Sequence, residues 1–436
     1  MYRETAGLVM YGQLGKDSIL MKLGSLVEKM EHDDSYSREE LVRAIYDEVY
    51  RLLDLSTTYG FDNNLWQCYI AYLLATTENP FSILCETVGA SKDGTVNEIV
   101  KQDMEHFYRL FHYDFSEMEK KLGVACFETL THYHSMAKAE NTYNKSVSEK
   151  VRDLASQLCE AKNGEDFFDI VTAFYKRYGV GKFGLNKAFR VVHTGDEMVL
   201  SPITHTSDVT LDELIGYELQ KKQLVENTEA FVEGRRANNC LLFGDSGTGK
   251  STCIKAILNQ YYEKGLRLIE VYKHQFQDLS AIIETIKNRN YKFIIYMDDL
   301  SFEEFEIEYK YLKAVIEGGM EVRPDNVLIY ATSNRRHLIR ETWSDRSDMS
   351  NDELHRSDTM QEKLSLVARF GVSINFSKPS RKEYEDIILG LAAENPDIRL
   401  SKEELLLQAN AWSVRNGGYS GRVAEQFIIH LKSIES

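Results

Sequence analysis

The spacing of hydrophobic residues changes near the middle of the chain. In the first 178 residues the apolar positions recur three or four residues apart, as in an amphipathic helix. In residues 37–55 these positions are Leu41, Ile45, Val49, Leu52 and Leu53. Ser37 and Glu40 form a capping box ahead of this stretch, while Ser116 and Glu119 predict another helix to about residue 137, with a polar loop over 138–150. We therefore expect an all-helical N-terminal domain over residues 1–187.

Short apolar runs replace this pattern after residue 188. Residues 189–192 and 198–200 flank a polar turn and predict a hairpin, so we assign residues 188–207 to a hairpin or linker. Three largely apolar runs, at 239–243, 293–297 and 327–330, are typical of strands buried on both faces. After Pro379, three helices are predicted at about 381–394, 403–414 and 422–434. The pattern thus predicts an α/β region over 208–378 and a helical region over 379–436.

A glycine-rich segment lies between the predicted strand at 239–243 and a predicted helix that begins at Thr252. It satisfies the phosphate-loop pattern G-x-x-x-x-G-K-[ST] in full, with Gly244, Asp245, Ser246, Gly247, Thr248, Gly249, Lys250 and Ser251. The glycines allow a tight turn whose backbone N–H groups point at a polyphosphate, and the helix N-terminus adds partial positive charge. Lys250 is expected to reach the β- and γ-phosphates, and Ser251 to ligate Mg²⁺. We expect this loop and Thr252 to bind ATP.

Two carboxylates follow the predicted strand at 293–297. Asp298 and Asp299 stand there in the Walker B pattern. A carboxylate at the carboxyl end of a strand beside the phosphate loop can hold hydrated Mg²⁺, and we assign that role to Asp298. ATP and Mg²⁺ are therefore the expected cofactors.

Composition and charge indicate which partners and which cellular compartment to expect for this protein. The 436 residues carry a formal net charge of −16, which argues against a broad surface for nucleic acid or anionic membrane. The N-terminus lacks the basic and then apolar layout of a signal peptide, and no apolar run approaches the length of a membrane span. Six cysteines are scattered without a C-x-x-C pair and predict buried thiols in a reducing compartment. We expect a soluble, cytoplasmic protein that does not contact membranes.

Residues 208–436 resemble AAA+ ATPases. Ile215 and Gly216 match the apolar residue and glycine that line the adenine pocket in that class. Asn334, after the strand at 327–330, matches the sensor-1 side chain that contacts the γ-phosphate or the attacking water, and Thr332 is a weaker match. The alternative for Asn334 is a polar helix cap.

Two arginines extend the resemblance. Arg369, in the run 366–371, resembles the arginine finger, which in ring-forming AAA+ proteins reaches the neighbouring subunit's nucleotide; a surface salt bridge is the alternative. Arg422, after the glycines at 417–421, resembles sensor 2, and the three C-terminal helices resemble the small lid. The resemblance implies a ring-type homo-oligomer with a catalytic set of Asp299, Asn334, Arg369 and Arg422.

A narrower resemblance rests on the motifs at 227–229, 267–271, 298–303, 323–326 and 335–338. Together they resemble the bacterial family catalogued as domain of unknown function 815. That resemblance implies ATP binding and hydrolysis without a known substrate. Most AAA+ proteins carry glutamate where this chain has Asp299, which is one methylene shorter, although aspartate is usual in the narrower family. The shorter side chain of Asp299 thus bears on hydrolysis of ATP and not on its binding.

Three functions remain open from the sequence. The first is an oligomeric ATPase that remodels or regulates a protein or nucleic-acid partner through the helical domain. The second is an ATP-dependent switch or scaffold with little hydrolysis, which Asp299 motivates. The third is a DNA-associated loader or motor. The loop at 272–278 lacks the glycine of peptide-threading AAA+ proteins, although Phe276 could point into a pore, and the long insertion at 340–363 is a candidate contact with a subunit or client.

Overall fold

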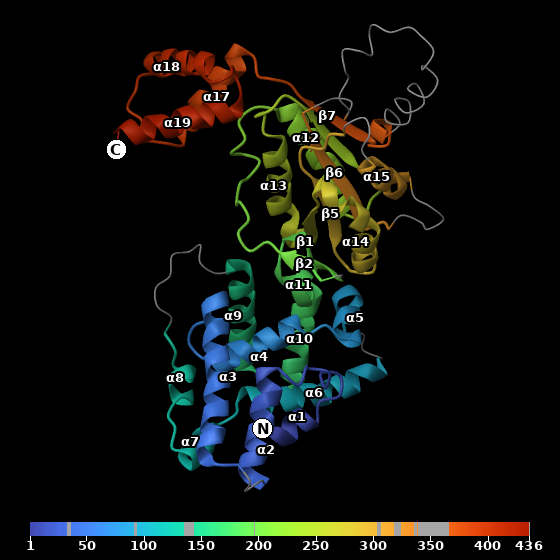
Figure 1. Cartoon of the computed structure of the whole chain (residues 1–436), viewed down its shortest axis with the longest axis vertical. Coiled ribbons are helices and arrows are strands. Elements are labelled where there is room, and N and C mark those ends of the chain that lie inside the picture. The colour runs from blue at the N-terminus through green and yellow to red at the C-terminus, as the bar shows by residue number, and fades with distance from the viewer. Residues whose placement is uncertain are drawn as a thin grey trace. The chain divides into compact units, whose positions relative to one another are not determined.

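The computed structural model describes residues 1–32, 36–90, 94–134, 144–195, 197–302, 307–317, 324–334, 338 and 366–435. The chain forms two compact units, Met1–Asn186 and Lys187–Ser436 (Figure 1). The insertion at 340–363, and residues 303, 323 and 335–337 of the motifs above, lie outside the described residues.

The first unit is built from helices. Its helices are α1 (Tyr2–Ala6), α2 (Ile19–His32), α3 (Arg38–Tyr59), α4 (Leu65–Thr76), α5 (Pro80–Val88), α6 (Thr95–Phe111), α7 (Ser116–Leu122), α8 (Phe127–Thr131), α9 (Lys145–Glu160), α10 (Gly164–Tyr178) and α11 (Gly181–Leu185). The most apolar of the longer helices, α4, is also the most central, since it packs against α3, α6, α9, α10 and α11. Its Trp66 is buried, and the indole N–H donates to the Leu110 carbonyl at 2.7 Å.

Of the helix boundaries predicted from capping residues in this unit, some are confirmed and others are wrong. The capping box of Ser37 and Glu40 is confirmed at the start of α3. The single helix predicted over 116–137 is wrong, because Gly123 adopts a left-handed conformation and ends α7. Glu119 does not cap that helix but accepts from the backbone N–H of Phe127, which begins α8. The predicted loop over 138–150 is also wrong in its last part, because α9 begins at Lys145.

A seven-stranded sheet forms the centre of the second unit. Its strands are β1 (Ala188–Thr194), β2 (Glu197–Pro202), β3 (Cys240–Gly244), β4 (Leu266–Glu270), β5 (Lys292–Met297), β6 (Val327–Ser333) and β7 (Val372–Phe376). The spatial order is β2-β1-β4-β5-β6-β3-β7, and all neighbouring strands are parallel except β1 and β2. The predicted hairpin at 188–202 is therefore present, and it extends the sheet through pairing of β1 with β4.

Helices cover both faces of this sheet. On one face, α12 (Glu218–Val232) and α13 (Lys250–Tyr261) bury apolar residues against β3, β6 and β7, while α14 (Leu279–Ile286) and α15 (Glu308–Glu317) lie on the other face (Figure 1). Two short 3₁₀ helices, η1 (Tyr262–Lys264) and η2 (Lys273–Asp278), connect these layers. Phe276, in η2, is 1% exposed and packs against Phe302, so it does not point into a pore.

Three C-terminal helices form a small bundle with its own core. They are α17 (Arg381–Ala393), α18 (Lys402–Arg415) and α19 (Gly421–Glu435), as the sequence predicts. The predicted fold class is confirmed: a P-loop α/β core with a largely parallel sheet and a C-terminal helical lid, preceded by an all-α region.

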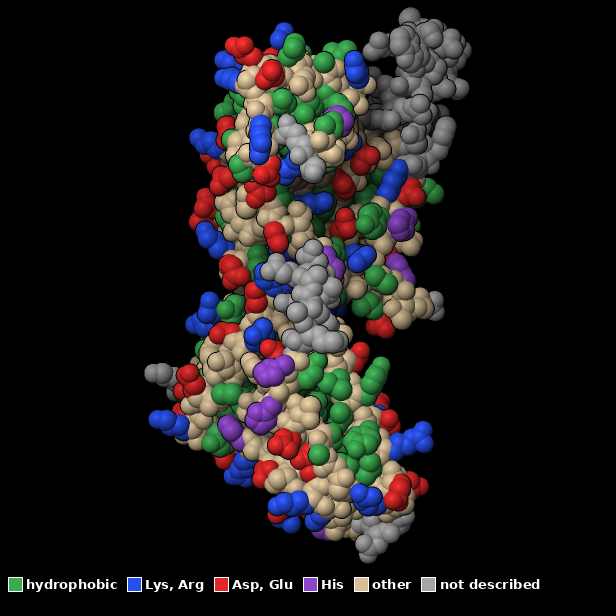
Figure 2. Space-filling view, turned by 90° about the vertical axis from the view of Figure 1, so that its left-hand side faces the viewer, with side chains coloured by type: hydrophobic (Ala, Val, Ile, Leu, Met, Phe, Trp, Pro, Cys, Tyr) green, Lys and Arg blue, Asp and Glu red, His purple; other side chains and the backbone are tan. Residues whose placement is uncertain are grey.

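The helices, the surface charges and the cysteines can be compared with the expectations from composition. Within the described residues, no helix combines the length and apolar character needed to cross a membrane. Acidic and basic side chains are interspersed over the face shown in Figure 2. Cys240 and Cys253, which flank the phosphate loop, are buried, and burial raises the pKa of both thiols, that of Cys253 to about 12. Neither thiol is therefore primed for redox chemistry.

Candidate functional site

The phosphate loop connects the carboxyl end of β3 to the start of α13. Gly244 has φ +132°, and a Cβ there would collide with the backbone of Phe376 on the neighbouring strand. Gly249, with φ +87°, turns the chain into α13. The Thr248 hydroxyl donates to the Asp245 carbonyl at 2.8 Å and ties the loop to itself. The loop therefore turns tightly at the N-terminus of α13, a position that favours anion binding.

Lys250 lies under this loop with its ammonium group fully engaged. Its Nζ donates to the carbonyls of Gly244 and Asp245, at 3.0 and 2.6 Å, and to Asn334 Oδ1 at 3.1 Å. Burial lowers the pKa of Lys250, although the nearby carboxylates oppose this shift. A desolvated cation beside an anion-binding loop is matched to a phosphate group.

Asp298 stands directly after β5 and faces Ser251 of α13. The Ser251 hydroxyl donates to Asp298 Oδ1 at 2.7 Å, which brings together the two residues predicted to hold the metal. Thr332 and Tyr296 donate to the same oxygen, at 2.6 and 2.7 Å. Burial alone would raise the pKa of Asp298, but these three hydrogen bonds outweigh it and bring the pKa below its ordinary value. The carboxylate is thus held in its charged form.

Asp299 occupies a constrained turn. Its φ is +50°, in the left-handed region that residues other than glycine rarely adopt. The end of β6 fixes this turn: the Asp299 N–H donates to Thr332 Oγ1 at 2.9 Å, and the Leu300 N–H donates to the Thr332 carbonyl at 2.7 Å. Asn334 Nδ2 donates to Asp299 Oδ1 at 2.7 Å. Asn334 therefore bridges Lys250 and the second carboxylate.

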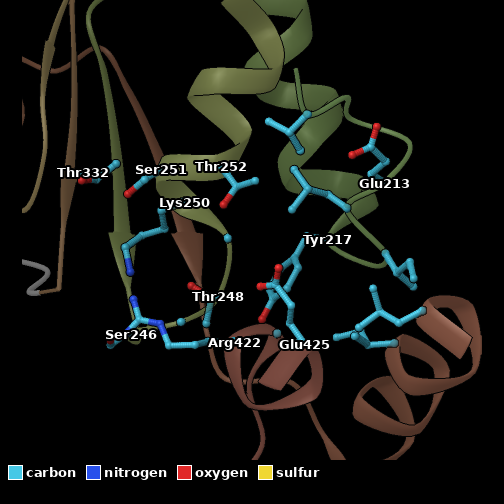
Figure 3. Close-up of a pocket in the computed structure, with 18 of the residues that line it drawn as sticks. Glu213, Tyr217, Ser246, Thr248, Lys250, Ser251, Thr252, Thr332, Arg422 and Glu425 are labelled. Atoms are coloured by element: carbon cyan, nitrogen blue, oxygen red, sulfur yellow. The ribbon is translucent and has the colours of Figure 1, made fainter. Parts of the chain in front are cut away.

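These groups open onto one cavity of about 660 Å³ between the α/β core and the lid (Figure 3). The apolar residues that line it are Val209, Leu214 and Ile215 together with Ile387 and Leu391 of α17, and Ile215 lies against Gly390 of that helix. A cavity that joins the polar groups of the loop to apolar side chains suits a nucleotide.

Arg422 brings positive charge from the lid to the loop. Its backbone N–H donates to the Gly247 carbonyl at 3.2 Å, and its Cβ lies close to the space above Gly247. In Figure 3 the Arg422 side chain extends from α19 toward the loop, and its charge contributes to the lowered pKa of Lys250. The cations of Lys250 and Arg422 thus lie close enough to interact.

Most of the predicted site residues line this cavity. They are Ile215, Ser246, Gly247, Thr248, Gly249, Lys250, Ser251, Thr252, Asp298, Asp299, Asn334 and Arg422. Gly216, Gly244 and Asp245 are not among the lining residues, although the carbonyls of the last two anchor Lys250. The Asp245 carboxylate accepts a hydrogen bond from the backbone N–H of Lys378 at 2.8 Å, and so ties the loop to the segment after β7.

Arg369 lies away from the cavity of its own chain. It is exposed and precedes β7, so it lies at the amino end of a strand whose carboxyl end meets the phosphate loop. The first and last of the five residues of β7 are separated by about 13 Å, at 3.3 Å per residue.

Sequence reasoning missed several contributors to the site, among them Tyr217, Glu425 and Tyr296. Tyr217, also with positive φ, and Glu425 line the cavity, while Tyr296 contacts Asp298 from within β5. A signal for Tyr296 was present, because residues two apart on a strand point to the same face and Tyr296 stands two before Asp298. Tyr217 and Glu425 carried no such signal.

The fold and the loop define an α/β protein with the P-loop fold. A model of the family described as "Protein of unknown function (DUF815)" matches residues 185–434, and the chain belongs to this family. The family predicted from the motifs is thus confirmed.

Comparison with solved structures finds the RuvB Holliday junction branch migration motor of Thermotoga maritima. The two are 19% identical, the match covers 51% of this chain and 64% of that chain, and the TM-score is 0.36. An arginine-to-alanine variant of the same motor is 19% identical over 52% of this chain and 65% of that chain, with a TM-score of 0.36. A threonine-to-valine variant is 17% identical over 52% and 71%, with a TM-score of 0.32. This chain therefore spans about two thirds of the motor's length. No curated protein matches it.

Proposed function

We propose that this chain binds ATP with Mg²⁺ in the cavity and hydrolyses ATP at the interface between subunits of a ring-type homo-oligomer. Hydrolysis would remodel or regulate a protein or nucleic-acid partner held by the helical unit. The observation that carries the proposal is the hydrogen bond from Ser251, next to Lys250 at the start of α13, to the carboxylate of Asp298 after β5.

The donor set suits a small hard cation. Ser251 and Asp298 offer hydroxyl and carboxylate oxygens, the ligands that Mg²⁺ prefers, and they are already in contact. When bound, Mg²⁺ would neutralise charge on the β- and γ-phosphate oxygens. The chain's own part is to cradle the phosphates with the loop N–H groups, to place Lys250 and Arg422 beside them, and to position water with Asp299 and Asn334.

The position of Arg369 supports a shared site. An arginine at the amino ends of the strands cannot serve the cavity at their carboxyl ends, but it can serve a second subunit placed head to tail. Its fixed charge would then stabilise the transferring phosphoryl group.

A mixing experiment tests this arrangement. Arg369→Ala should lower the ATPase rate about a thousandfold or more while ATP binding is kept. Lys250→Ala should prevent binding but keep Arg369. Random mixing of the two variants gives about a quarter of interfaces with an intact loop and an intact arginine, so activity should return. If the mixture stays as inactive as its components, the shared site is wrong.

An ATP-dependent switch with little hydrolysis is a second candidate. Asp299, which stands where a catalytic carboxylate is expected, is hydrogen-bonded to Asn334 and held in a left-handed turn. A carboxylate engaged in this way is less available to activate water. Tight ATP binding by the wild-type chain with turnover far below about 1 s⁻¹ would favour the switch over the motor.

A further inference from the structure

The carboxylate of Asp298 is used unevenly. Tyr296, Ser251 and Thr332 all donate their hydroxyl hydrogens to Oδ1, at 2.7, 2.7 and 2.6 Å. Among the described residues, none donates a hydrogen bond to Oδ2. One oxygen is therefore saturated and the other is left for a ligand.

Two of the three donors are not part of the phosphate loop. Tyr296 is 2% exposed, and its hydroxyl reaches Asp298 from inside the sheet. Thr332 accepts from the Asp299 N–H, so its single hydroxyl hydrogen is committed to Asp298. These two donors come from β5 and β6, and neither has to move when a nucleotide enters.

We propose that Tyr296 and Thr332 are positioning residues for the divalent cation. Their hydroxyl groups hold Oδ1 of Asp298 against β5 and β6. Only Oδ2 can then contact a metal ion or its bound water. This inference rests on the proposed function, because it concerns the metal that accompanies ATP.

A preference among cations follows from this geometry. Ca²⁺ takes six to eight ligands and often binds a carboxylate through both oxygens, whereas Mg²⁺ keeps several waters and needs few carboxylate contacts. A carboxylate restricted to one free oxygen therefore favours Mg²⁺ over Ca²⁺. Removing one of the hydroxyl groups that hold Oδ1 should reduce the gain in nucleotide affinity that Mg²⁺ gives. It should also reduce the difference between the affinities measured in Mg²⁺ and in Ca²⁺.

The test measures the affinity for the fluorescent analogue mant-ATP in EDTA, in Mg²⁺ and in Ca²⁺. For Tyr296→Phe we expect the Mg²⁺-dependent gain in affinity to fall about tenfold, the usual effect of removing a partner of a metal ligand, with the affinity in EDTA unchanged. Tyr330→Phe is the matched control, because Tyr330 pairs with Tyr296 in the sheet and is equally buried. Its hydroxyl contacts Thr228 and Asn227 instead, so the Mg²⁺ gain should stay at the wild-type value.

A second pair of variants covers the case in which Tyr296→Phe does not fold. Thr332→Ser keeps the hydroxyl and should keep the Mg²⁺-dependent gain in affinity. Thr332→Val lacks the hydroxyl, and its gain should be about tenfold smaller. Equal Mg²⁺ gains in the wild type and in the folded variants that lack either hydroxyl would overturn the proposal while leaving the proposed function intact. A wild-type chain that binds no mant-ATP under any of the three conditions would contradict the proposed function and this inference together.

Discussion

Asp103 in the helical unit and Asp298 in the nucleotide-binding unit each accept three hydrogen bonds, but from different donors. Asp103 is fully buried in α6 and accepts from the backbone N–H groups of Val9, Met10 and Tyr11, at 2.8, 2.8 and 3.0 Å, through both of its oxygens. Asp298 accepts from three hydroxyl groups through one oxygen at the wall of a cavity. Both oxygens of Asp103 are occupied in holding the backbone of residues 9–11. In Asp298 all three bonds end on Oδ1, and Oδ2 can still bind a ligand.

The same substitution therefore has opposite consequences at the two positions. Asparagine has one acceptor oxygen and one donor nitrogen in its side chain. At position 298 a single oxygen can keep all three hydroxyl bonds. At position 103 the amide nitrogen must face a backbone N–H.

The largest effect is expected from Asp298→Asn. The ATPase rate should fall about a thousandfold, because the negative charge that would hold the metal is lost and that stabilisation is worth several kcal/mol. The free energy of unfolding should change by less than about 1 kcal/mol, since the hydroxyl bonds are kept. Steady-state phosphate release and urea unfolding measure the two quantities. A large loss of stability would show that Asp298 is a structural residue like Asp103.

The next largest effect is expected from Asp103→Asn. The helical unit should lose about 3 kcal/mol of stability, because at least one buried N–H loses its charged partner. Hydrogen–deuterium exchange should rise in residues 9–11 and in α6, while mant-ATP affinity stays at the wild-type value. Unchanged exchange in these segments would contradict the structural role assigned to Asp103.

A smaller effect is a proton taken up when ATP binds at alkaline pH. Burial lowers the pKa of Lys250 below 10.5, so the free protein loses this charge at a lower pH than an ordinary lysine does. A phosphate beside the amine favours the charged form and raises the pKa again. Between these two pKa values, ATP binding should take up less than about one proton per site.

Calorimetric titrations in buffers of different ionisation enthalpy measure this uptake. Lys250→Arg is the matched control, because a guanidinium group stays protonated throughout this range. Equal uptake in the wild type and in this variant would assign the proton to another group.

Local patterns explain how much of this molecule could be predicted. The phosphate loop, the strand before Asp298 and the capping box of Ser37 are defined by residues close together in the sequence. The sequence alone therefore predicted the fold class and most of the residues that line the cavity.

The failures arose from a local turn signal that the prediction passed over and from contacts between residues far apart in the sequence. The helix predicted to reach residue 137 ends at Gly123, and Glu119 caps the next helix instead of its own. Phe276 is buried by Phe302, which is 26 positions later in the chain. The convergence of Tyr296 and Thr332 on one oxygen depends on the pairing of β5 with β6, a register that no local pattern specifies.

The most direct test is calorimetric titration of the wild-type chain with ATP in the presence of Mg²⁺, beside Lys250→Ala. We predict one ATP per chain for the wild type, and an affinity at least about a hundredfold lower for the variant, because about 3 kcal/mol of charge-assisted bonding to phosphate is lost. A well-folded wild-type chain that gives no heat of binding with ATP would contradict the account.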